Sequence, residues 1–526
     1  MKVLVFGASG IIGQHMRLCI PDGIQPIWYR HTPDPITRGV DICDSAALAA
    51  CLAEHDPDVI VNLAGESRPD VVERDPERYD TLNVAVPVEL AKWCGENGRR
   101  LIHVSSQAVF SGDHAPYAAG PSPDNPVNQY GRQKLWAETQ LLGKPGVTIV
   151  RPTFVLGVRP LPHVGRANPA EQMMTEQAAG YQGMRQVNDR WFSPLFARSA
   201  ARMLWGIMTH DDGQRVIHLG LPRRTTRHEV ATALGVPTEP VSHDSFSGIA
   251  QRPVDTTYSA ATTRYLNGWA AGLDRIRVDW EDRQTMNWSD RAREIALFLG
   301  LTYEQTVSRL CKGFAHQHAE VAADFRRVNP QTDERLLEWY GMTDAYIWEL
   351  SAYHADPGWN YDGTCRGIGD RLESAGARRV LCLGDGIGDL TLALHRRGFE
   401  AVYHDLAGSR TAEFAAFRFW RHSGQAMPCH LTETWQPMNG ARAPYDAVVS
   451  LDFLEHVTDV SAWVQAIKRV LTPGGYFCAQ NAFGIGSEPG GSLPMHLSRN
   501  DRYVQEWDPL LAALGFRQES SNWYRT

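Results

Sequence analysis

Three residues with complementary proton chemistry lie in the first third of the chain, namely Ser106, Tyr130 and Lys134. Tyr130 and Lys134 stand four residues apart in YGRQK, so a helix would place both on one face. An ammonium group beside a phenol favours the phenolate and lowers its pKa from about 10. The tyrosine could then exchange a proton with a carbonyl or alcohol whose oxygen Ser106 also bonds. A YxxxK pair alone also occurs on helix surfaces, but its order after GASGIIG and VSSQAVFSG favours a functional interpretation.

Two glycine-rich turns lie almost at opposite ends of the sequence. GASGIIG occupies Gly7 to Gly13, and LGDGIG occupies Leu383 to Gly388. Each turn follows an apolar β-type run and opens a helical pattern, which is the context that raises a glycine motif above chance. Glycine lets the backbone turn sharply and approach a ligand, and the following helix presents free N–H groups. The sequence therefore predicts two nucleotide-type ligands.

The elements that would position these residues alternate between strand and helix. Strands are expected at Lys2–Phe6, Ile24–Trp28, Val59–Leu63, Leu101–Ser105 and Val147–Arg151, and again at Val380–Leu383, Ala401–His404, Ala447–Leu451 and Tyr476–Asn481. This alternation predicts an α/β protein with two doubly wound parallel sheets.

The domain organisation expected from these patterns has three parts. Residues 1–286 form a nucleotide-binding domain whose less regular part, 152–286, is a substrate lobe with a helix near Phe196–Met208 and a strand near Val216–Leu219. Residues 287–375 form a helical connector and cap, with helices at Ala292–Leu299, Gln305–Phe325 and Asp333–Tyr353. Residues 376–526 form the second α/β domain.

Composition narrows the class of partner. A chain of 526 residues is too long to fold around a single hydrophobic core. Its formal net charge of −8, without a basic block, argues against nucleic acid as a binding partner. No apolar run is long enough to span a bilayer, so we expect a cytoplasmic protein with no membrane partner. The nine cysteines form no CxxC pair, and His316 and His318 would point to different sides of a helix. We expect no metal site, and a homodimer is left open.

The first half resembles the extended short-chain dehydrogenase/reductases, and within them the dTDP-4-dehydrorhamnose reductase group. The resemblance covers about Met1 to Met286 through KVLVFGASGIIG, DVIVNLAGES, HVSSQAVFSGDHAPY, NPVNQYGRQKLWAE and RPVDTTYS. It implies a Rossmann-like domain with Ser106, Tyr130 and Lys134 as catalytic residues. It also implies a nicotinamide cofactor near Gly7, Gly10, Ile11, Ile12, Gly13, Arg30, Asp41, Ile42, Asn62, Leu63, Ala64, Gly65, Asn83 and Lys134. The segment RPTFVLGVRPLPHVGRANP departs from the expected pattern, which leaves the substrate open.

The end of the second predicted strand bears on the choice of cofactor. It reads Trp28-Tyr29-Arg30, without the acidic residue that would hold the ribose 2′-hydroxyl of NAD. Arg30 could instead pair with a 2′-phosphate, although a surface arginine would look the same. This pattern favours NADP over NAD.

The second half resembles the class I S-adenosylmethionine-dependent methyltransferases over about Arg378 to Thr526. The resembling segments are VLCLGDGIGDLTLALHRRGFEAVYHDL, YDAVVSLDFLEHV and LTPGGYF. The resemblance implies S-adenosylmethionine near Gly384, Asp385, Gly386, Gly388, Asp405, Leu406 and Asp452. Cys382 replaces the acidic residue common before the turn. His456 or His496 could serve as a general base, or both could simply pack.

These features together predict a bifunctional enzyme. One domain would reduce a ketone with NAD(P)H, and the other would methylate a metabolite of the same pathway, such as a nucleotide-linked sugar or its derivative. Three alternatives are an epimerase or dehydratase that retains NAD, a cofactor-bound regulatory module for the methyltransferase, and a non-enzymatic binding protein.

Overall fold

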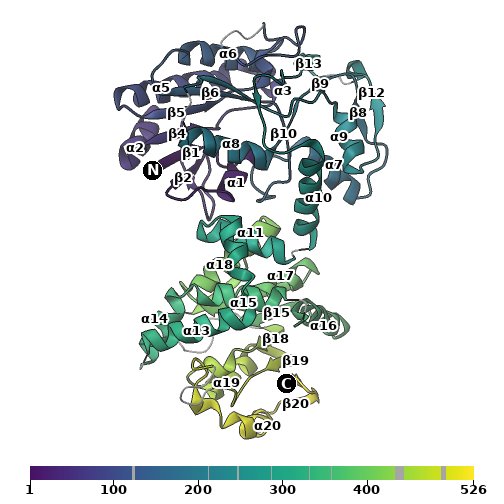
Figure 1. Ribbon diagram of the computed structural model, residues 1–526. Coiled ribbons are helices and arrows are strands. Elements are labelled where there is room, and N and C mark those ends of the chain that lie inside the picture. Colours follow the sequence, from purple (N-terminus) through teal and green to yellow (C-terminus); the bar gives the residue numbers. More distant parts are fainter. Residues whose placement is uncertain are drawn as a thin grey trace. The chain divides into compact units, whose positions relative to one another are not determined.

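The computed structural model describes residues 1–120, 125–210, 213–245, 248–285, 287–330, 332–356, 358–432, 444–486 and 493–526. The chain folds into two compact units (Figure 1). The first contains Met1–Met286 and Leu299–Glu304, and the second contains Asn287–Phe298 and Gln305–Thr526. Met286, the end of the predicted first domain, lies outside the described residues.

The first unit is built on a fully parallel sheet of eight strands in the order β3-β2-β1-β4-β5-β6-β11-β14. The strands are β1 (Lys2–Phe6), β2 (Gln25–Arg30), β3 (Arg38–Gly39), β4 (Val59–Asn62), β5 (Arg100–Val104), β6 (Val147–Pro152), β11 (Val216–Leu219) and β14 (Thr263–Arg264). The strand order reverses between β1 and β4, which is where doubly wound sheets bind ligands. All five strands predicted from Met1 to Arg151 are present, displaced by at most two residues.

Helices cover both faces of this sheet because alternate strand residues point to opposite sides. Val3 and Val5 pack with Met16 of α1 (Ile11–Arg17) and Trp205 of α8 (Ala197–Thr209). The opposite face packs against α2 (Ser45–His55), α5 (Val86–Glu96) and α6 (Gln129–Leu141), through a cluster that contains Leu4, Phe6, Leu52, Leu90 and Leu141. Figure 1 shows these helices around the sheet.

The region predicted as one substrate lobe divides between two structures. Helix α8 and strands β11 and β14 complete the large sheet and its core. The rest contains three short parallel pairs, β7 (Phe154–Leu156) with β10 (Pro194–Phe196), β8 (Arg185–Val187) with β12 (Glu239–Val241), and β9 (Trp191–Phe192) with β13 (Asp255–Thr256). Helices α7 (Pro169–Ala178), α9 (Arg227–Leu234) and α10 (Trp269–Thr285) accompany them.

The helical region between the two α/β segments is more broken than predicted. It contains α11 (Trp288–Leu299), α12 (Tyr303–Leu310), α13 (Phe314–Val328), α14 (Asp333–Met342), α15 (Ala345–Ala355) and α16 (Tyr361–Ser374). The single helices predicted over Gln305–Phe325 and Asp333–Tyr353 are wrong. The first is interrupted before Gly313, whose φ is +82°, and the second at Thr343, whose backbone is extended.

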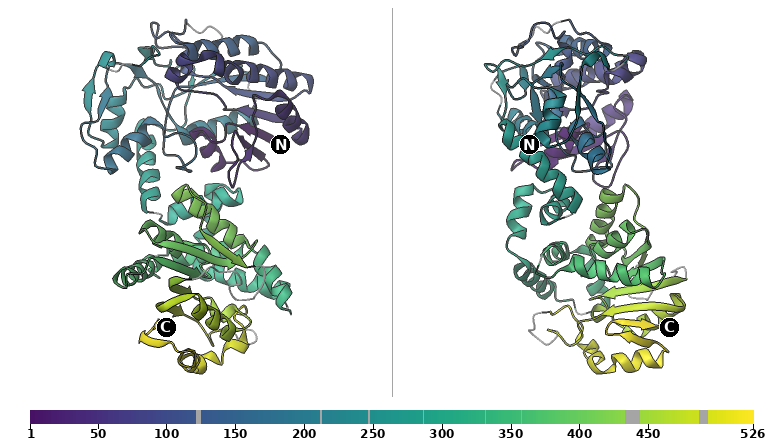
Figure 2. Two further views of the ribbon diagram at one scale, coloured as in Figure 1. Left: turned by 180° about the vertical axis from the view of Figure 1, so that it is seen from behind. Right: turned by 90° about the vertical axis from the view of Figure 1, so that its right-hand side faces the viewer.

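The second unit has a seven-stranded sheet in the order β17-β16-β15-β18-β19-β21-β20. Its strands are β15 (Arg379–Leu383), β16 (Glu400–Leu406), β17 (Cys429–Thr432), β18 (Tyr445–Leu451), β19 (Leu471–Gln480), β20 (Arg517–Ser520) and β21 (Trp523–Arg525). The strands from β17 to β19 are parallel, and β21 and β20 add an antiparallel edge. Figure 2 gives two further views of this green and yellow sheet. Its order reverses between β15 and β18.

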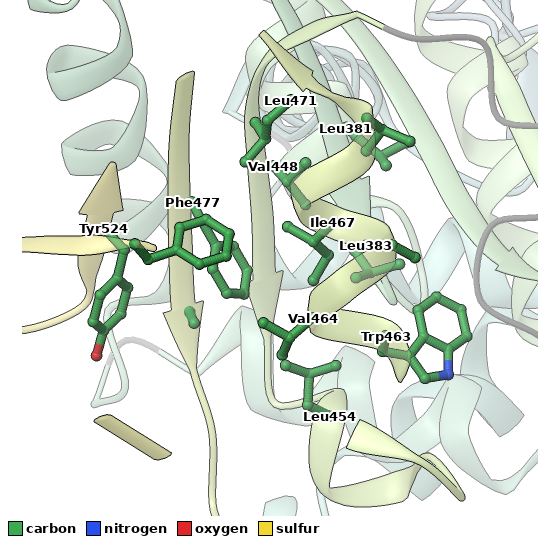
Figure 3. Packing of buried hydrophobic residues seen from close by; sticks show 14 of the residues in the cluster. Leu381, Leu383, Val448, Leu454, Trp463, Val464, Ile467, Leu471, Phe477 and Tyr524 are labelled. Atoms are coloured by element: carbon green, nitrogen blue, oxygen red, sulfur yellow. The ribbon is translucent and has the colours of Figure 1, made fainter. Parts of the chain in front are cut away.

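The core of the second unit lies between the sheet and helix α19 (Val460–Val470), as Figure 3 shows. Trp463, Val464 and Ile467 share one helix face and are at most 2% exposed. They belong to the same cluster as Leu381 and Val448 of the two central strands. The remaining helices of the α/β part are α17 (Asp389–Arg396), α18 (Arg410–Ser423) and α20 (Tyr503–Ala513). Among the described residues, no helix is both long and apolar enough to cross a membrane.

Candidate active sites

The first glycine turn connects β1 to α1 and has no space for side chains. Gly7 has φ +81°, and a Cβ atom there would lie 2.6 Å from the backbone nitrogen of Ala64. A Cβ atom on Gly13 would lie 2.8 Å from Cα of Ala8. The turn is therefore closed against the end of β4 and against its own helix, as a dinucleotide-binding turn requires. Ile11 and Ile12 follow it as half-buried residues of α1.

Gln14 joins this turn to a loop that is distant in sequence. Its side-chain amide donates to the carbonyls of Ser9 and Val164, at 2.8 and 2.9 Å, and accepts from the backbone N–H of Leu161 at 2.8 Å. Gly165 lies so close that a Cβ atom there would be 2.2 Å from the Ser9 carbonyl oxygen. The segment that departs from the rhamnose-enzyme pattern thus forms one wall beside the glycine turn, a role that the sequence analysis did not predict.

Ser106 and Tyr130 meet because α6 packs closely against the turn that follows β5. Ser106 begins that turn, and its hydroxyl accepts from the Ala108 N–H at 3.1 Å. A Cβ atom on Gly131 would lie 2.2 Å from the Ala108 carbonyl oxygen, so only glycine permits this approach. Asn128 caps α6 by accepting from the Gly131 N–H at 2.8 Å. Tyr130 is 6% exposed, and its phenol lies near enough to Ser106 for that side chain to lower its pKa.

The electrostatics of Tyr130 differ from the expectation based on its spacing to Lys134. Burial raises the pKa of the Tyr130 phenol, the Ser106 side chain lowers it, the charge of Glu66 raises it, and Arg166 lowers it. The net direction is upward because desolvation of the phenolate dominates. The cation that acts on Tyr130 is thus Arg166, whereas the expected cation was Lys134. The phenol is protonated at neutral pH, which suits it to donate a proton.

Lys134 lies beneath the backbone at the end of β4. Its ammonium donates to the Val104 carbonyl at 3.3 Å, and a Cβ atom on Gly65 would lie 3.2 Å from Nζ. Burial lowers the pKa of Lys134 to about 8, although Glu138 opposes the shift. Asn83 lies in a π-helical segment, Thr81–Ala85, where it accepts from the Glu66 N–H at 3.0 Å and donates to Gln133 at 2.8 Å.

The other predicted cofactor residues of this unit lie along the same strand ends. Asn62 accepts from the Ala64 N–H at 3.0 Å, which fixes the chain after β4, and Leu63 is half-buried. Asp41 is exposed and accepts from the Cys43 N–H, whereas Ile42 is buried in the core.

Arg30 is already paired in this structure. Its Nη1 donates to Asp34 at 2.7 Å, and the Asp34 side chain is only 3% exposed. The sequence analysis missed Asp34 because it stands four residues beyond the end of β2. The strand β2 itself ends at Arg30 without an acidic residue, as the sequence analysis stated, and the acidic partner of Arg30 stands in the segment that follows.

Several arginines lie near one another in the part of this unit that was predicted as a substrate lobe. Burial lowers the pKa of the Arg190 guanidinium, and the charge of Arg252 lowers it further. Burial also lowers the pKa of Arg227, which lies near enough to Arg190 to feel its charge. The Nε atoms of Arg190 and Arg227 are buried without a hydrogen-bond partner in the described structure. Such guanidinium groups suit an anionic ligand.

The second glycine turn connects β15 to α17. Gly384, Gly386 and Gly388 have φ values of +67°, +50° and +78°. Cβ atoms on the first two would lie 2.2 Å from the Phe453 ring and 2.6 Å from the Leu350 side chain. Each position therefore requires glycine both for backbone conformation and for space.

Asp385 holds the start of α17. Its carboxylate accepts from the backbone N–H groups of Leu390 and Thr391, at 3.2 and 2.7 Å, and from the Thr391 hydroxyl at 2.6 Å. Burial raises the pKa of Asp385 to about 7, against the lowering effect of these hydrogen bonds. Both oxygens thus serve the helix, and Cys382 is buried in the core behind the turn.

Asp405 lies near the end of β16, next to the glycine turn. The Tyr403 hydroxyl lies 2.7 Å from the Gly386 carbonyl oxygen and 3.0 Å from the Asp405 carboxylate. The Leu406 N–H donates to the other carboxylate oxygen at 2.7 Å. Burial raises the pKa of Asp405 to about 6. A carboxylate at this strand end can accept hydrogen bonds from both hydroxyls of a ribose.

A cavity of about 500 Å³ extends from this turn and is lined by the glycines, Asp405, Asp452 and residues of the helical region. Both histidines predicted as candidate bases line it. His456 Nδ1 lies 3.0 Å from the Tyr340 hydroxyl, and His496 Nδ1 lies 3.0 Å from the Ile485 carbonyl oxygen. Burial lowers the pKa of His456 to about 3 and also lowers that of His496. Both rings are therefore neutral at physiological pH.

A buried ionic network fixes α11 to the second glycine turn. Arg418 of α18 donates to Glu294 at 2.8 Å, to Asp389 at 2.7 Å and to the Ile387 carbonyl. Arg421 donates to Asp290 at 2.5 and 2.8 Å. The side chains of Asp290, Glu294, Arg418 and Arg421 are at most 2% exposed. Sequence reasoning had no signal for this network, because charged residues at helical spacing are usually solvated.

Groups with metal-ligand chemistry occur twice in the described part of the chain. Asp290, Glu294 and His422 form one group, but Arg421 already contacts both carboxylates. Glu455, His456 and His496 form the other, at the cavity. His316 and His318 pair with separate carboxylates, Glu320 and Glu349.

Comparison with known proteins agrees with this two-part geometry. Residues 1–273 match the family model of the RmlD substrate binding domain, and residues 347–515 match that of a methyltransferase domain. The chain therefore belongs to the RmlD substrate-binding-domain family and carries a C-terminal methyltransferase domain, as the two resemblances predicted.

Individual relatives are similar to parts of the chain. Methionine adenosyltransferase 2 subunit beta of Xenopus tropicalis is 33% identical over 162 residues, which are 30% of this chain and 47% of that protein. A probable low-salt glycan biosynthesis reductase of Haloferax volcanii is 31% identical over 166 residues, 30% of this chain and 55% of its own length. The chain thus spans about half the length of these curated relatives.

Among solved structures, the dTDP-4-dehydrorhamnose reductase of Bacillus anthracis in complex with NADP aligns with a TM-score of 0.47 and 19% identity. That alignment covers 53% of this chain and 99% of the reductase. The corresponding reductase from Clostridium acetobutylicum aligns with a TM-score of 0.46 and 19% identity. That alignment covers 54% of this chain and 100% of the reductase.

Proposed function

We propose that the protein is a bifunctional enzyme. Its first unit would reduce a ketone with NADPH or NADH on a nucleotide-linked sugar or a related metabolite, and its second unit would transfer a methyl group from S-adenosylmethionine. The observation that carries the proposal is the buried contact of Tyr130 with Ser106, next to Lys134 and the glycine turn at the switch point of the sheet. The proposed cofactor positions remain those of the sequence analysis.

The first unit's residues fit a nicotinamide nucleotide, because Cβ atoms on Gly7 and Gly13 would close the turn that has to approach a pyrophosphate. When bound, the nicotinamide supplies a hydride to the carbonyl carbon. Tyr130 then donates its phenolic proton to the carbonyl oxygen, and Ser106 hydrogen-bonds the same oxygen. The charge of Arg166 would stabilise the phenolate that remains, and Lys134 would place a second positive charge beneath Gly65.

The arginines support an anionic substrate for this unit. Arg190, Arg227 and Arg252 come from three separate segments of the substrate-binding part, and two of them keep unpartnered Nε atoms. A pyrophosphate would satisfy these donors, which is the chemistry that a nucleotide-linked sugar provides.

The second unit's residues fit S-adenosylmethionine, because Gly384 and Gly386 of the turn line the cavity and the Asp405 carboxylate lines it too, where it would accept hydrogen bonds from the ribose hydroxyls. When bound, the sulfonium supplies an electrophilic methyl group. The cavity residues would align the acceptor with the carbon–sulfur bond, which is most of what methyl transfer requires. Fusion of the two units raises their effective mutual concentration, which helps when one product is the other's substrate.

A second candidate is a regulatory role for the first unit, in which a bound nucleotide controls methyl transfer. It is favoured by the similarity to methionine adenosyltransferase 2 subunit beta, a protein named as a subunit of another enzyme. In that case Tyr130→Phe would leave all pathway chemistry intact, while removal of the nucleotide would stop methylation.

The testing experiment compares metabolites by mass spectrometry in producing cells that carry the parent protein, Tyr130→Phe or Asp405→Ala. We expect the first variant to accumulate a ketone and the second an unmethylated alcohol, which would also set the order of reactions. Asp370→Asn, an exposed change on α16, is the matched control for Asp405→Ala. Unchanged metabolites in both variants would remove the proposed catalytic roles.

A further inference from the structure

The cavity of the second unit has an unbalanced set of charges. Five carboxyl groups line it, from Glu349, Asp385, Asp405, Asp452 and Glu455. The described lining residues include no lysine and no arginine. A ligand for this cavity has to be compatible with negative charge.

Two of the carboxyl groups remain available for an acceptor. Asp385 binds the start of α17, Asp405 stands at the ribose position, and Glu349 forms an ion pair with His318. Asp452 and Glu455 are left, one helical turn apart beyond β18.

Glu455 is the more unusual of the two. It is 1% exposed, and its Oε1 accepts from the Ala482 N–H at 3.0 Å, whereas its Oε2 is buried with no hydrogen-bond partner in the described structure. Burial and the charge of Asp452 raise its pKa to about 8. A carboxylate without a partner is costly to bury, so a ligand that brings positive charge would be stabilised here.

The neighbouring histidines do not neutralise this charge. His456 and His496 pack with ring centroids 4.7 Å apart, and burial lowers the pKa of each. Protonation of both rings would place two cations in contact. Both rings therefore act as neutral hydrogen-bonding groups at physiological pH.

An aromatic cluster adds a second feature that favours a cation. Phe314, Tyr353 and Trp359 lie with ring centroids 5.2 to 5.8 Å apart, and all three line the cavity. The Trp359 side chain is large and the residue is 53% exposed. Aromatic faces attract ammonium groups, and they also cover the apolar body of a ligand.

We propose that the methyl acceptor of the second unit is an amine, bound as its ammonium form by the carboxylates of Asp452 and Glu455 and by the aromatic cluster, and methylated at nitrogen. This proposal rests on the methyltransferase function proposed above, and it excludes an intact nucleotide-linked sugar from this cavity. The arginines of the first unit have no counterpart among the described lining residues here.

Methyl transfer to the amine requires loss of one proton from nitrogen and cleavage of one carbon–sulfur bond. The bound ammonium gives one proton to the Glu455 carboxylate and becomes a neutral amine. The nitrogen lone pair forms the new bond to the methyl carbon, and the carbon–sulfur bond breaks with its electron pair going to sulfur. The sulfonium becomes a neutral thioether, and the product is a methylated ammonium ion. A Glu455 carboxyl with a raised pKa suits this proton transfer.

The test uses the full chain saturated with S-adenosylhomocysteine, which prevents turnover. Calorimetric titrations would compare phenethylamine with 2-phenylethanol, 3-phenylpropionate and dTDP. We expect the amine to bind at least about tenfold more tightly than the alcohol, because only the ammonium gains both the carboxylates and the aromatic faces; tenfold corresponds to about 1.4 kcal/mol. Amine binding should also release protons, seen as a dependence of the heat on buffer ionisation, because a cation lowers the raised carboxyl pKa.

Two variants localise the effect. In Glu455→Gln the amine should bind no more tightly than the alcohol. Trp359→Leu, at an exposed position, should weaken binding of the amine several-fold. Glu320→Gln, on the same unit outside this cavity, is the matched control. An amine that binds no better than the alcohol, or tighter binding of the propionate or dTDP in this cavity, overturns the inference. Failure of S-adenosylhomocysteine to bind would instead overturn the methyltransferase function itself.

Discussion

Arg418 donates its Nε hydrogen to a carboxylate oxygen of Glu294 at 2.8 Å, with both side chains at most 2% exposed. The same guanidinium reaches the Ile387 carbonyl within the second glycine turn and Asp389 at the start of α17. The charges of Arg418, His422 and Arg291 hold the pKa of Glu294 well below its usual range despite burial. The backbone around the proposed cofactor thus depends on Glu294, a residue 53 positions before the methyltransferase domain begins at residue 347.

Glu294→Ala should strongly destabilise the second unit. It removes one buried carboxylate from two guanidinium groups, Arg418 and Arg421, which keep Asp389 and Asp290 as partners. Loss of one member of a buried ion pair costs about 3–5 kcal/mol. The free energy of unfolding from urea titrations would measure this. Glu373→Ala, which removes an exposed partner of Arg397, should cost at most about 1 kcal/mol. Equal effects of the two changes would mean that the buried network does not stabilise the unit.

Tyr130→Phe should lower ketone reduction by about 10²–10⁴-fold and leave methyl transfer unchanged. The loss reflects removal of the proton donor, while the aromatic ring that fills the site is kept. Initial rates of NADPH oxidation and of methyl transfer would be measured on the same preparation. Tyr181→Phe makes the same chemical change at a residue that is 60% exposed, and it should alter neither rate. Retained reduction in Tyr130→Phe would remove this residue from the mechanism.

Gly384→Ala should abolish binding of S-adenosylmethionine. The residue has φ +67°, and its new Cβ atom would lie 2.2 Å from the Phe453 ring and 2.7 Å from the Phe453 Cβ atom. Gly376→Ala is the matched control, because its φ is +70° but no atom lies within 4 Å of a Cβ atom there. Backbone strain of about 1–2 kcal/mol is common to both changes, so the difference isolates close packing. Equal cofactor affinities, measured by calorimetry, would contradict the proposed site.

The stability of the first unit should rise with pH between about 8 and 10.5. Burial lowers the pKa of Lys134 from 10.5 to about 8, so in this window the unfolded chain binds more protons than the folded one. Stability gained over the window is on the order of 2–3 kcal/mol. Pulse proteolysis in urea at both ends of the range would measure it for this unit. Lys134→Met should remove the gain, and a wild-type dependence that persists in the variant would assign it to other groups.

The sequence was most informative where local pattern and global fold agree. The strands around Val3, Val61 and Val448 are short apolar runs beside glycine turns, and all form central strands of parallel sheets. The helical region was less predictable because Gly313 and Thr343 interrupt otherwise continuous periodicity, and a single glycine or threonine is tolerated in many helices.

The site residues likewise divide into features that follow from local sequence spacing and features that depend on tertiary structure. The positions of Tyr130 and Lys134 followed from helical spacing, but the direction of the Tyr130 pKa depends on burial and on Arg166, which lies thirty-six residues away. The pairing of Arg30 with Asp34 and the approach of the Gly165 loop to Ser9 are also tertiary effects. Neither leaves a pattern of short period, so sequence spacing could not identify them.

The path of the chain between the two units limits how the protein can be divided. Asn287–Phe298 belongs to the second unit, yet Leu299–Glu304 returns to the first, where the Tyr303 N–H donates to the Leu18 carbonyl at 3.0 Å. A single cut therefore cannot release two whole enzymes. Expression of residues 305–526 alone would leave Arg418 and Arg421 without the acids of α11, and a cut at 286 would remove a segment from the first unit. The two units are thus tied together by interleaved segments of chain, so that splitting the gene at one point would require rebuilding both units.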